Sequence, residues 1–342
     1  MKKLFKTYET FVALTVILLC LAIGLRNPVF FTASNFVDLL RNSIVDGIMA
    51  FALMLGIIIG GIDVSFPAIA VVSMYLTNKV LEATSYNGPA IIPILAATLI
   101  GTLLGFVNGM LITKFELPAF IVTLGTSSLF DGLLVWLIGS KPVNRLVAPL
   151  EAFGKSEFFR VQSGDTSASL PYTFTFLVII IVVVWFILNK TMLGRMIYAI
   201  GGDRVSAERA GFPVKKITVF VYTFIGMAGG LAGIVHSIQA RMCIPTDLMG
   251  CEMIIIAAVV LGGTKISGGR GTVLGTALGL AIIVVAQNSL ILVGIPSTWQ
   301  RFVLGLIIVA GTGVSAYQAL RASRKIAPVM TDDHPEGGAI NG

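Results

Sequence analysis

Ten long apolar runs constrain this chain more than any other feature of its sequence. A helix needs about 20 apolar residues to cross a bilayer. Only helices and closed barrels satisfy their backbone polar groups in lipid, and these runs lack the alternation of barrel strands. We therefore predict an all-α, polytopic transmembrane helix bundle of about ten spans. The predicted spans are 8–25, 43–61, 64–83, 91–113, 118–139, 172–188, 217–239, 250–263, 272–293 and 299–319.

Composition supports a membrane protein. Only 12% of the 342 residues are charged and 56% are hydrophobic, whereas soluble domains carry about 25% charged residues. The net charge of +7 lies between the apolar runs, as in membrane loops, which makes membrane lipid a predicted partner and argues against nucleic acid. With both termini cytoplasmic, fifteen of the 24 Lys and Arg residues face the cytoplasm, which is a modest positive-inside bias.

This topology divides the chain into two parts. Residues 1–324 form the predicted transmembrane domain, and the polar tail 325–342 is predicted to be disordered and cytoplasmic. Two connections are longer than a turn. The segment 140–171 is assigned to the outside, and the basic segment 189–216 is assigned to the inside.

A polar break separates the second and third runs. It contains Gly60, Gly61, Asp63 and Ser65. Asp63 and Ser65 lie where the next helix begins, so one interpretation is an ordinary N-cap. The other is a discontinuous helix that lines a translocation path or supports a gate, because polar groups within the membrane are costly.

A second glycine-rich turn joins the runs that end near 263 and begin near 272. Its glycines include Gly262, Gly263, Gly268 and Gly269. The sequences Gly-Gly-Ile-Asp-Val-Ser at 60–65 and Gly-Gly-Thr-Lys-Ile-Ser at 262–267 are alike, which raises the possibility of a duplicated element. Both turns face the cytoplasm in the predicted topology.

Other polar residues interrupt the apolar runs, among them Asn108, Asp131 and Asn288. Each could form a hydrogen bond between helices or line a translocation path, and the first is the more ordinary role. No series of titratable residues crosses the membrane, so a proton relay is not indicated. Glycines spaced four apart, as at 101, 105 and 109, predict close helix packing.

The sequence offers no catalytic constellation of its own. The only Gly-Lys-Ser, at 154–156, lacks the upstream glycine of a P-loop, so no ATPase site is predicted. Three cysteines and two histidines form no metal pattern, and we predict neither a metal site nor a cofactor. Cys243 and Cys251 are interpreted as buried thiols, and a disulfide between them is the alternative.

The basic inner segment has two interpretations. Ser206 to Gly211 could form a short amphipathic helix that ends at Gly211 and Pro213. The segment is then either a simple cytoplasmic loop or a docking element for a cytoplasmic partner.

Four ordered motifs resemble the ribose/simple-sugar permease family of ABC importers, over about residues 10–320. They are Gly-Gly-Ile-Asp-Val-Ser at 60–65, Pro-Ala-Phe-Ile-Val-Thr-Leu-Gly-Thr at 118–126, Gly-Arg-Met-Ile-Tyr-Ala-Ile-Gly-Gly-Asp at 194–203 with Ala-Glu-Arg-Ala-Gly at 207–211, and Ala-Ala-Val-Val-Leu-Gly-Gly-Thr-Lys-Ile-Ser-Gly-Gly-Arg-Gly-Thr-Val-Leu-Gly-Thr at 257–276. Phe66-Pro67 departs from the family pattern, which usually has Val-Gly at these positions. Because of this departure, the resemblance does not define the bend after Asp63.

The resemblance implies a membrane subunit in the cell (inner) membrane that forms the path for a small sugar or sugar-like solute. It would work as a homo- or heterodimer with a cytoplasmic ABC ATPase, which binds ATP and Mg, and a periplasmic or lipid-anchored sugar-binding protein. The predicted coupling residues are Gly194, Arg195, Gly201, Gly202, Glu208 and Gly211. The alternatives are a stand-alone carrier or channel, which does not explain the basic docking segment, and a membrane enzyme, which lacks a catalytic constellation.

Overall fold

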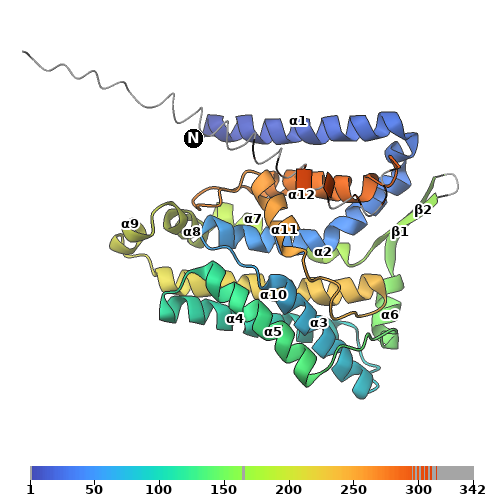
Figure 1. Ribbon diagram of the computed structural model, residues 1–342, viewed down its shortest axis with the longest axis horizontal. Coiled ribbons are helices and arrows are strands. Elements are labelled where there is room, and N and C mark those ends of the chain that lie inside the picture. Colours follow the sequence, from blue (N-terminus) through green and yellow to red (C-terminus); the bar gives the residue numbers. More distant parts are fainter. Residues whose placement is uncertain are drawn as a thin grey trace, which may run out of the picture.

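The computed structural model describes residues 2–163 and 166–294, together with eight separate positions between 296 and 313. Side chains are described from residue 9 onward. The described chain is a helix bundle with one small hairpin (Figure 1). The predicted tenth span, 299–319, and the predicted tail, 325–342, lie outside the residues described continuously.

In the part of the chain that the structure describes, five helices are long and apolar enough to cross a membrane. They are α1 (Lys2–Arg26), α2 (Ala33–Ile58), α4 (Ile91–Phe115), α5 (Ala119–Leu137) and α10 (Val214–Ala240). A sixth results if α7 (Phe174–Lys190) and α8 (Met192–Gly202), which meet at a bend of 76°, count as one span. The prediction of a polytopic helical protein is confirmed, whereas the number of ten spans stays a prediction.

Three further helices lie in the predicted apolar runs 64–83, 250–263 and 272–293. They are α3 (Phe66–Ala83), α11 (Glu252–Leu261) and α12 (Val273–Ser289). The ten residues of α11 extend only about 15 Å at 1.5 Å per residue, which is half of a bilayer core of about 30 Å. Helix α11 alone therefore covers half of the core, and the crossing predicted at 250–263 stays a prediction.

Helix α2 begins ten residues before the predicted span at 43–61. A 3-10 turn, η1 (Pro28–Phe31), precedes it, and the hydroxyl of Thr32 caps it by accepting a hydrogen bond from the Asn35 amide at 3.3 Å. The added turns carry polar residues, which the hydropathy of the sequence excluded from the span.

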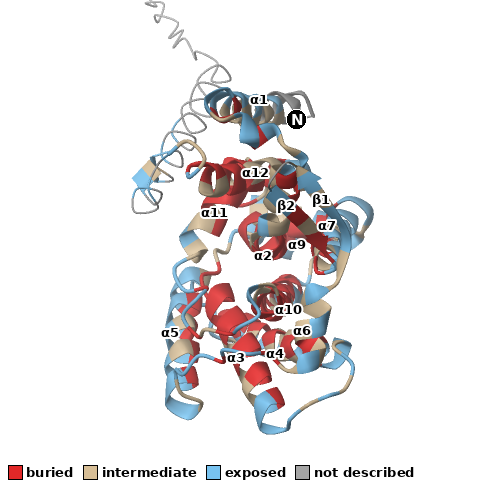
Figure 2. Cartoon of the chain, turned by 90° about the vertical axis from the view of Figure 1, so that its right-hand side faces the viewer, coloured by how far each residue is buried: buried red, intermediate tan, exposed pale blue. Residues whose placement is uncertain are grey.

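The core lies between α2 and α10. In both helices 78% of the most apolar 18-residue stretch is buried, compared with 17% in α1 and 28% in α5. Figure 2 shows this contrast between a buried centre and an exposed periphery. Exposed apolar residues on α1, α4, α5 and α7 give these helices surfaces suited to lipid or to other membrane subunits.

Glycines permit the closest helix contact, between α4 and α10. A Cβ at Gly105 would overlap the Tyr222 carbonyl oxygen, and a Cβ at Gly101 would overlap the Gly226 carbonyl oxygen. Because these positions lack side chains, the two backbones meet directly. The predicted role of the four-residue glycine spacing in helix packing is confirmed here.

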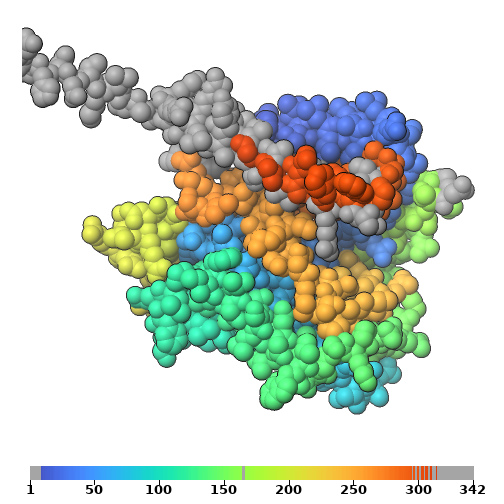
Figure 3. Space-filling model, in the orientation of Figure 1, coloured from blue at the N-terminus to red at the C-terminus, as the bar shows by residue number. Residues whose placement is uncertain are grey.

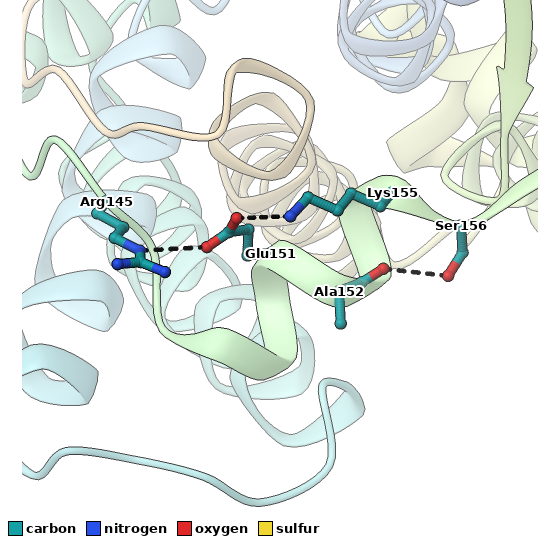
Figure 4. Close-up of polar contacts among 5 residues, drawn as sticks. All are labelled: Arg145, Glu151, Ala152, Lys155 and Ser156. Atoms are coloured by element: carbon teal, nitrogen blue, oxygen red, sulfur yellow. Dashed lines mark hydrogen bonds and ion pairs between the residues drawn. The ribbon is translucent and has the colours of Figure 1, made fainter.

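The segment 140–171, expected to be an outer loop, contains regular structure. It forms α6 (Ala148–Lys155) and an antiparallel hairpin of β1 (Glu157–Ser163) and β2 (Thr166–Pro171). Glu151 of α6 pairs with Lys155 at 2.7 Å and with Arg145 at 3.4 Å (Figure 4). Lys155 and then Arg145 lower the pKa of the Glu151 carboxyl. Apart from this two-stranded sheet, which the apolar pattern did not reveal, the elements of the described residues are helices.

The basic segment 189–216 also contains helices, α8 and α9 (Arg204–Arg209). Figure 1 places α8, α9 and the start of the described chain at one end of the molecule and the hairpin at the other. A hydrogen bond of 2.7 Å from Thr272 Oγ1 to Glu9 Oε1 joins the beginning of α1 to the turn before α12.

Cys243 and Cys251 are free thiols, in agreement with the simpler of the two interpretations.

Candidate functional site

The first glycine turn ends α2 in a Schellman motif. The Gly61 amide donates to the Gly56 carbonyl oxygen at 2.9 Å, and the Gly60 amide donates to the Ile57 carbonyl oxygen at 3.0 Å. Gly60 has a φ of +90°, a conformation that residues with a side chain rarely adopt. The chain then runs without helical structure to Ser65, so α2 and α3 are separated by a true break.

A chain of buried hydrogen bonds fixes this break. Asp63 Oδ1 accepts from the Ser65 amide at 2.7 Å and from the Ser65 hydroxyl at 2.6 Å. Asn108 Nδ2 of α4 donates to the same hydroxyl at 2.7 Å. All three side chains are fully buried. The structure therefore brings Asn108 together with Asp63 and Ser65, which were predicted from a different part of the sequence.

Helix α5 holds the other side of the break. The Val64 amide donates to Thr123 Oγ1 at 3.2 Å, and Thr123 Oγ1 lies 3.4 Å from the Ile62 carbonyl oxygen. Thr123 is buried and was not among the predicted residues. Its position inside an apolar run could have indicated a polar contact, but threonine also bonds to its own helix, so the sequence signal was weak.

The N-cap interpretation is correct in part. Ser65 occupies the cap position of α3 but makes no side-chain cap bond, and the side chain of Asp63 binds the Ser65 amide instead. Pro67 fits the first turn of α3, where its missing amide hydrogen removes no helical bond. The departure Phe66-Pro67 is thus compatible with the break. In this structure the three polar side chains are sealed within the subunit rather than exposed to an open path.

Two of the predicted path residues lie elsewhere. Asp131 of α5 is half-buried, and its Oδ1 has no hydrogen-bond partner among the described residues. Asn288 of α12 accepts a hydrogen bond of 2.6 Å from Asn42 of α2 and donates one of 2.8 Å to the Val284 carbonyl oxygen. Asn288 therefore joins two helices, which is the more ordinary of its two predicted roles.

The second glycine turn ends α11 in the same way as the first ends α2. The Gly263 amide donates to the Val260 carbonyl oxygen at 2.8 Å, and the Thr264 amide donates to the Val259 carbonyl oxygen at 3.3 Å. Gly263 has a φ of +90°, equal to that of Gly60. By helix ends, Gly60 therefore corresponds to Gly263, one residue away from the alignment of the two Gly-Gly pairs.

The two glycine turns and the end of α8 meet at one junction. The Gly269 amide donates a hydrogen bond of 2.8 Å to the carbonyl oxygen of Ile58, which is the last residue of α2. A Cβ at Gly201 of α8 would overlap that same carbonyl oxygen, and a Cβ at Gly268 would lie 2.6 Å from the Gly201 carbonyl oxygen. The Tyr198 hydroxyl adds a hydrogen bond of 2.7 Å to the Gly271 carbonyl oxygen. We call the contact of residues 58–60, 198–202 and 268–271 the glycine junction.

Helix α8 is anchored to the bundle, and α9 projects from it. Gly194, Ile197 and Ile200 of α8 are buried, and a Cβ at Gly194 would overlap the Ile187 carbonyl oxygen. In α9 only Ala207 is buried. Figure 3 shows this region standing out at one end of the molecule.

The ends of α9 are well defined. Asp203 caps it by accepting hydrogen bonds from the Val205 amide at 3.0 Å and the Ser206 amide at 3.3 Å. The Ser206 side chain, followed by its amide, lowers the pKa of the Asp203 carboxyl. Gly211, with a φ of +83°, ends the helix as predicted. The observed helix, Arg204–Arg209, begins two residues earlier than expected because Asp203 is the cap.

Four of the predicted coupling residues lie on the surface. Arg195, Gly202, Glu208 and Gly211 are exposed. Glu208 forms a surface ion pair of 3.5 Å with Arg204. Such a pair contributes little to stability, so Glu208 is free to interact with another protein.

A family model and individual relatives connect the chain to known proteins. Residues 35–311 match the family described as "Branched-chain amino acid transport system / permease component". The ribose import permease protein RbsC of Haemophilus influenzae is 32% identical over 310 residues, which covers 90% of this chain and 93% of that protein. RbsC of Bacillus subtilis is 34% identical, covering 86% and 88%, respectively. The D-allose transport system permease protein AlsC of Escherichia coli is 29% identical, covering 90% of each.

No solved structure gave a significant match. The family match nevertheless covers most of the chain and includes both glycine turns, the polar break and α8–α9. The matched relatives are membrane transport subunits, in agreement with the apolar helices described above. The chain therefore belongs to this family of permease components, as a multi-pass subunit of the cell membrane and not an enzyme.

Proposed function

We propose that the chain is the translocation subunit of an ATP-driven importer for a small sugar or sugar-like solute. The observation that carries the proposal is the glycine junction, which connects the projecting α8–α9 segment to the end of α2 and to the turn before α12. A movement of α9 would reach two helix ends of the core directly, without passing through flexible side chains. This is the connection that a subunit driven by an external motor requires.

The motor is proposed to be a cytoplasmic ABC ATPase that docks on α9 and on the adjacent exposed residues of α8. ATP and Mg would bind to that ATPase, and the permease subunit would need no cofactor of its own. Binding and hydrolysis of ATP would change the populations of inward-open and outward-open states through differential contact with α8–α9. The surface of α9 suits a protein partner because it presents charges of both signs, including Arg204 and Glu208.

The substrate class rests on the relatives. Two of them are described as ribose import permeases and a third as a D-allose transport permease, so pentoses and hexoses are the first candidates. A sugar-binding protein, periplasmic or lipid-anchored, would deliver the solute at the opposite end of the molecule, where α6 and the hairpin lie. A second permease subunit, identical or related, would complete the path.

The polar break would control the translocation path through the position of α3, since its side chains do not line an open path in this structure. Asp63, Ser65 and Asn108 hold α3, α4 and the end of α2 in a fixed relation. Rearrangement of these hydrogen bonds would change the position of α3. We therefore propose a gate role for Asp63, Ser65 and Asn108. Asp131 is the better candidate for solute contact, because it is half-buried and its Oδ1 has no hydrogen-bond partner among the described residues.

The test uses the importer purified from its native host and reconstituted in proteoliposomes. Glu208→Lys and Gly211→Trp should lower ATP-driven uptake of labelled ribose or allose while ATP hydrolysis continues and the permease still inserts. Normal uptake by both variants would refute the docking assignment. Sugar uptake by the purified chain alone, driven by a proton or sodium gradient, would refute the proposed function itself.

A further inference from the structure

The break between α2 and α3 encloses three buried polar atoms that have no hydrogen-bond partner in the described part of the chain. They are Asp63 Oδ2, Asn108 Oδ1 and the hydroxyl of Tyr222. The three side chains are at most 1% exposed. Burying such atoms without a partner is costly, so three of them around one break point to a small ligand.

The three side chains gather around residues 61–65. Asp63 and Asn108 are joined through the Ser65 hydroxyl by two hydrogen bonds in series, of 2.6 and 2.7 Å. Tyr222 of α10 faces the same segment, because a Cβ at Gly61 would overlap its hydroxyl. Helices α4 and α10 and the break thus each contribute one unpaired oxygen.

We propose that this site binds a single water molecule that joins the break to α4 and α10. Asp63 Oδ2 and Asn108 Oδ1 are acceptors, and the Tyr222 hydroxyl is a donor. One water can donate to both acceptors and accept from the hydroxyl, which matches the three hydrogen bonds that buried waters typically make. The ligand is therefore defined by its hydrogen-bonding capacity: two donors, one acceptor and the size of water.

A water fits better than a sodium or potassium ion. The negative charge of Asp63 already meets the amide and hydroxyl of Ser65 and the positive end of the α3 dipole. A cation would also leave the Tyr222 hydroxyl hydrogen without an acceptor, since the oxygens around it would point at the ion. This inference does not depend on the proposed substrate or on the docking of an ATPase.

Radiolytic hydroxyl labelling in H₂¹⁸O tests the site directly, because it modifies buried side chains that lie beside bound water. Tyr75 is the matched control: it is equally buried, and its hydroxyl already donates to the Lys141 carbonyl oxygen at 2.8 Å. In the purified full-length protein we expect Tyr222 to take up ¹⁸O at least several-fold faster than Tyr75. Equal, slow labelling of the two tyrosines would overturn the proposal.

Thermal unfolding of Tyr222→Phe gives a second readout. If water accepts a hydrogen bond from the hydroxyl, its removal should lower the Tm. A raised Tm would mean that the buried hydroxyl has no hydrogen-bond partner and destabilises the protein. That result would overturn the proposal. A sodium effect would also overturn the proposal. If the Tm rises when sodium chloride replaces choline chloride, and Asp63→Asn abolishes this rise, a cation and not a water occupies the site.

Discussion

The amide of Gly269 donates a hydrogen bond of 2.8 Å to the carbonyl oxygen of Ile58, the residue that ends α2. Ile58 and Gly269 are far apart in the sequence, and each belongs to a separate glycine turn. Gly201 of α8 packs against the same carbonyl oxygen. This small contact explains why glycines are needed on all three segments: their backbones meet where side chains would keep them apart.

The packing of α4 on α10 should tolerate no added methyl group at the contact. Gly105→Ala places a Cβ against the Tyr222 carbonyl oxygen and the Gly226 backbone, and we expect a loss of about 1–3 kcal/mol of stability. Gly125→Ala on α5 is the matched control, because a Cβ there has no neighbour within 4 Å. Thermal unfolding in detergent measures the difference. Equal Tm values for the two variants would contradict the observed packing.

Loss of the Asn108 side chain should destabilise the break. Asn108→Ala removes the hydrogen bond to Ser65 and leaves buried polar groups unpaired, at a cost of about 1–3 kcal/mol. Asn189→Ala provides the comparison, because Asn189 is exposed and donates to the Trp185 carbonyl oxygen of its own helix. We expect the Tm to fall for the first variant and to change little for the second. The opposite order would show that the network does not hold the break.

Helix α9 should lose its cap in acid. The folded-state pKa of Asp203 lies below its unfolded value, so the cap contributes stability above the unfolded pKa of about 3.9 and loses it as the pH falls through the folded pKa. Hydrogen exchange of residues 204–209, corrected for the intrinsic rate, should therefore be constant from pH 7 to pH 5 and increase below about pH 4. In Asp203→Ala, exchange should be fast throughout. Protection in this variant equal to that of the natural chain would show that the cap is unimportant.

The sequence predicted the apolar helices well because burial in lipid leaves a strong and continuous signal. It also identified Asp63, Ser65 and Asn108 as special, since polar residues within apolar runs are rare. That they touch one another follows only from the packing of α4 against the break. Thr123 and Tyr222 were missed because threonine and tyrosine are common in apolar helices without any special role.

Short elements at the membrane surface were harder to predict. The hairpin of β1 and β2 alternates only weakly between buried and exposed residues, and α8 lies in the basic segment 189–216, whose charges indicated a loop. The 76° bend at Thr191 depends on a cap, in which its hydroxyl accepts from the Gly194 amide at 3.2 Å, and on the close approach of Gly194 to α7. The similarity of the two glycine turns was visible, but the correspondence of Gly60 with Gly263 required the observed helix ends.

The central claim is that α8 transmits movement to the core through the glycine junction, and two neighbouring glycines test it. A Cβ at Gly201 would overlap the Ile58 carbonyl oxygen, whereas a Cβ at Gly202 has no neighbour within 4 Å. In proteoliposomes with the complete importer, the measurement is labelled sugar taken up per ATP hydrolysed. The account predicts a fall of at least several-fold for Gly201→Ala, with normal insertion and continued hydrolysis, and no change for Gly202→Ala. Equal coupling ratios for both variants and the natural chain would contradict it.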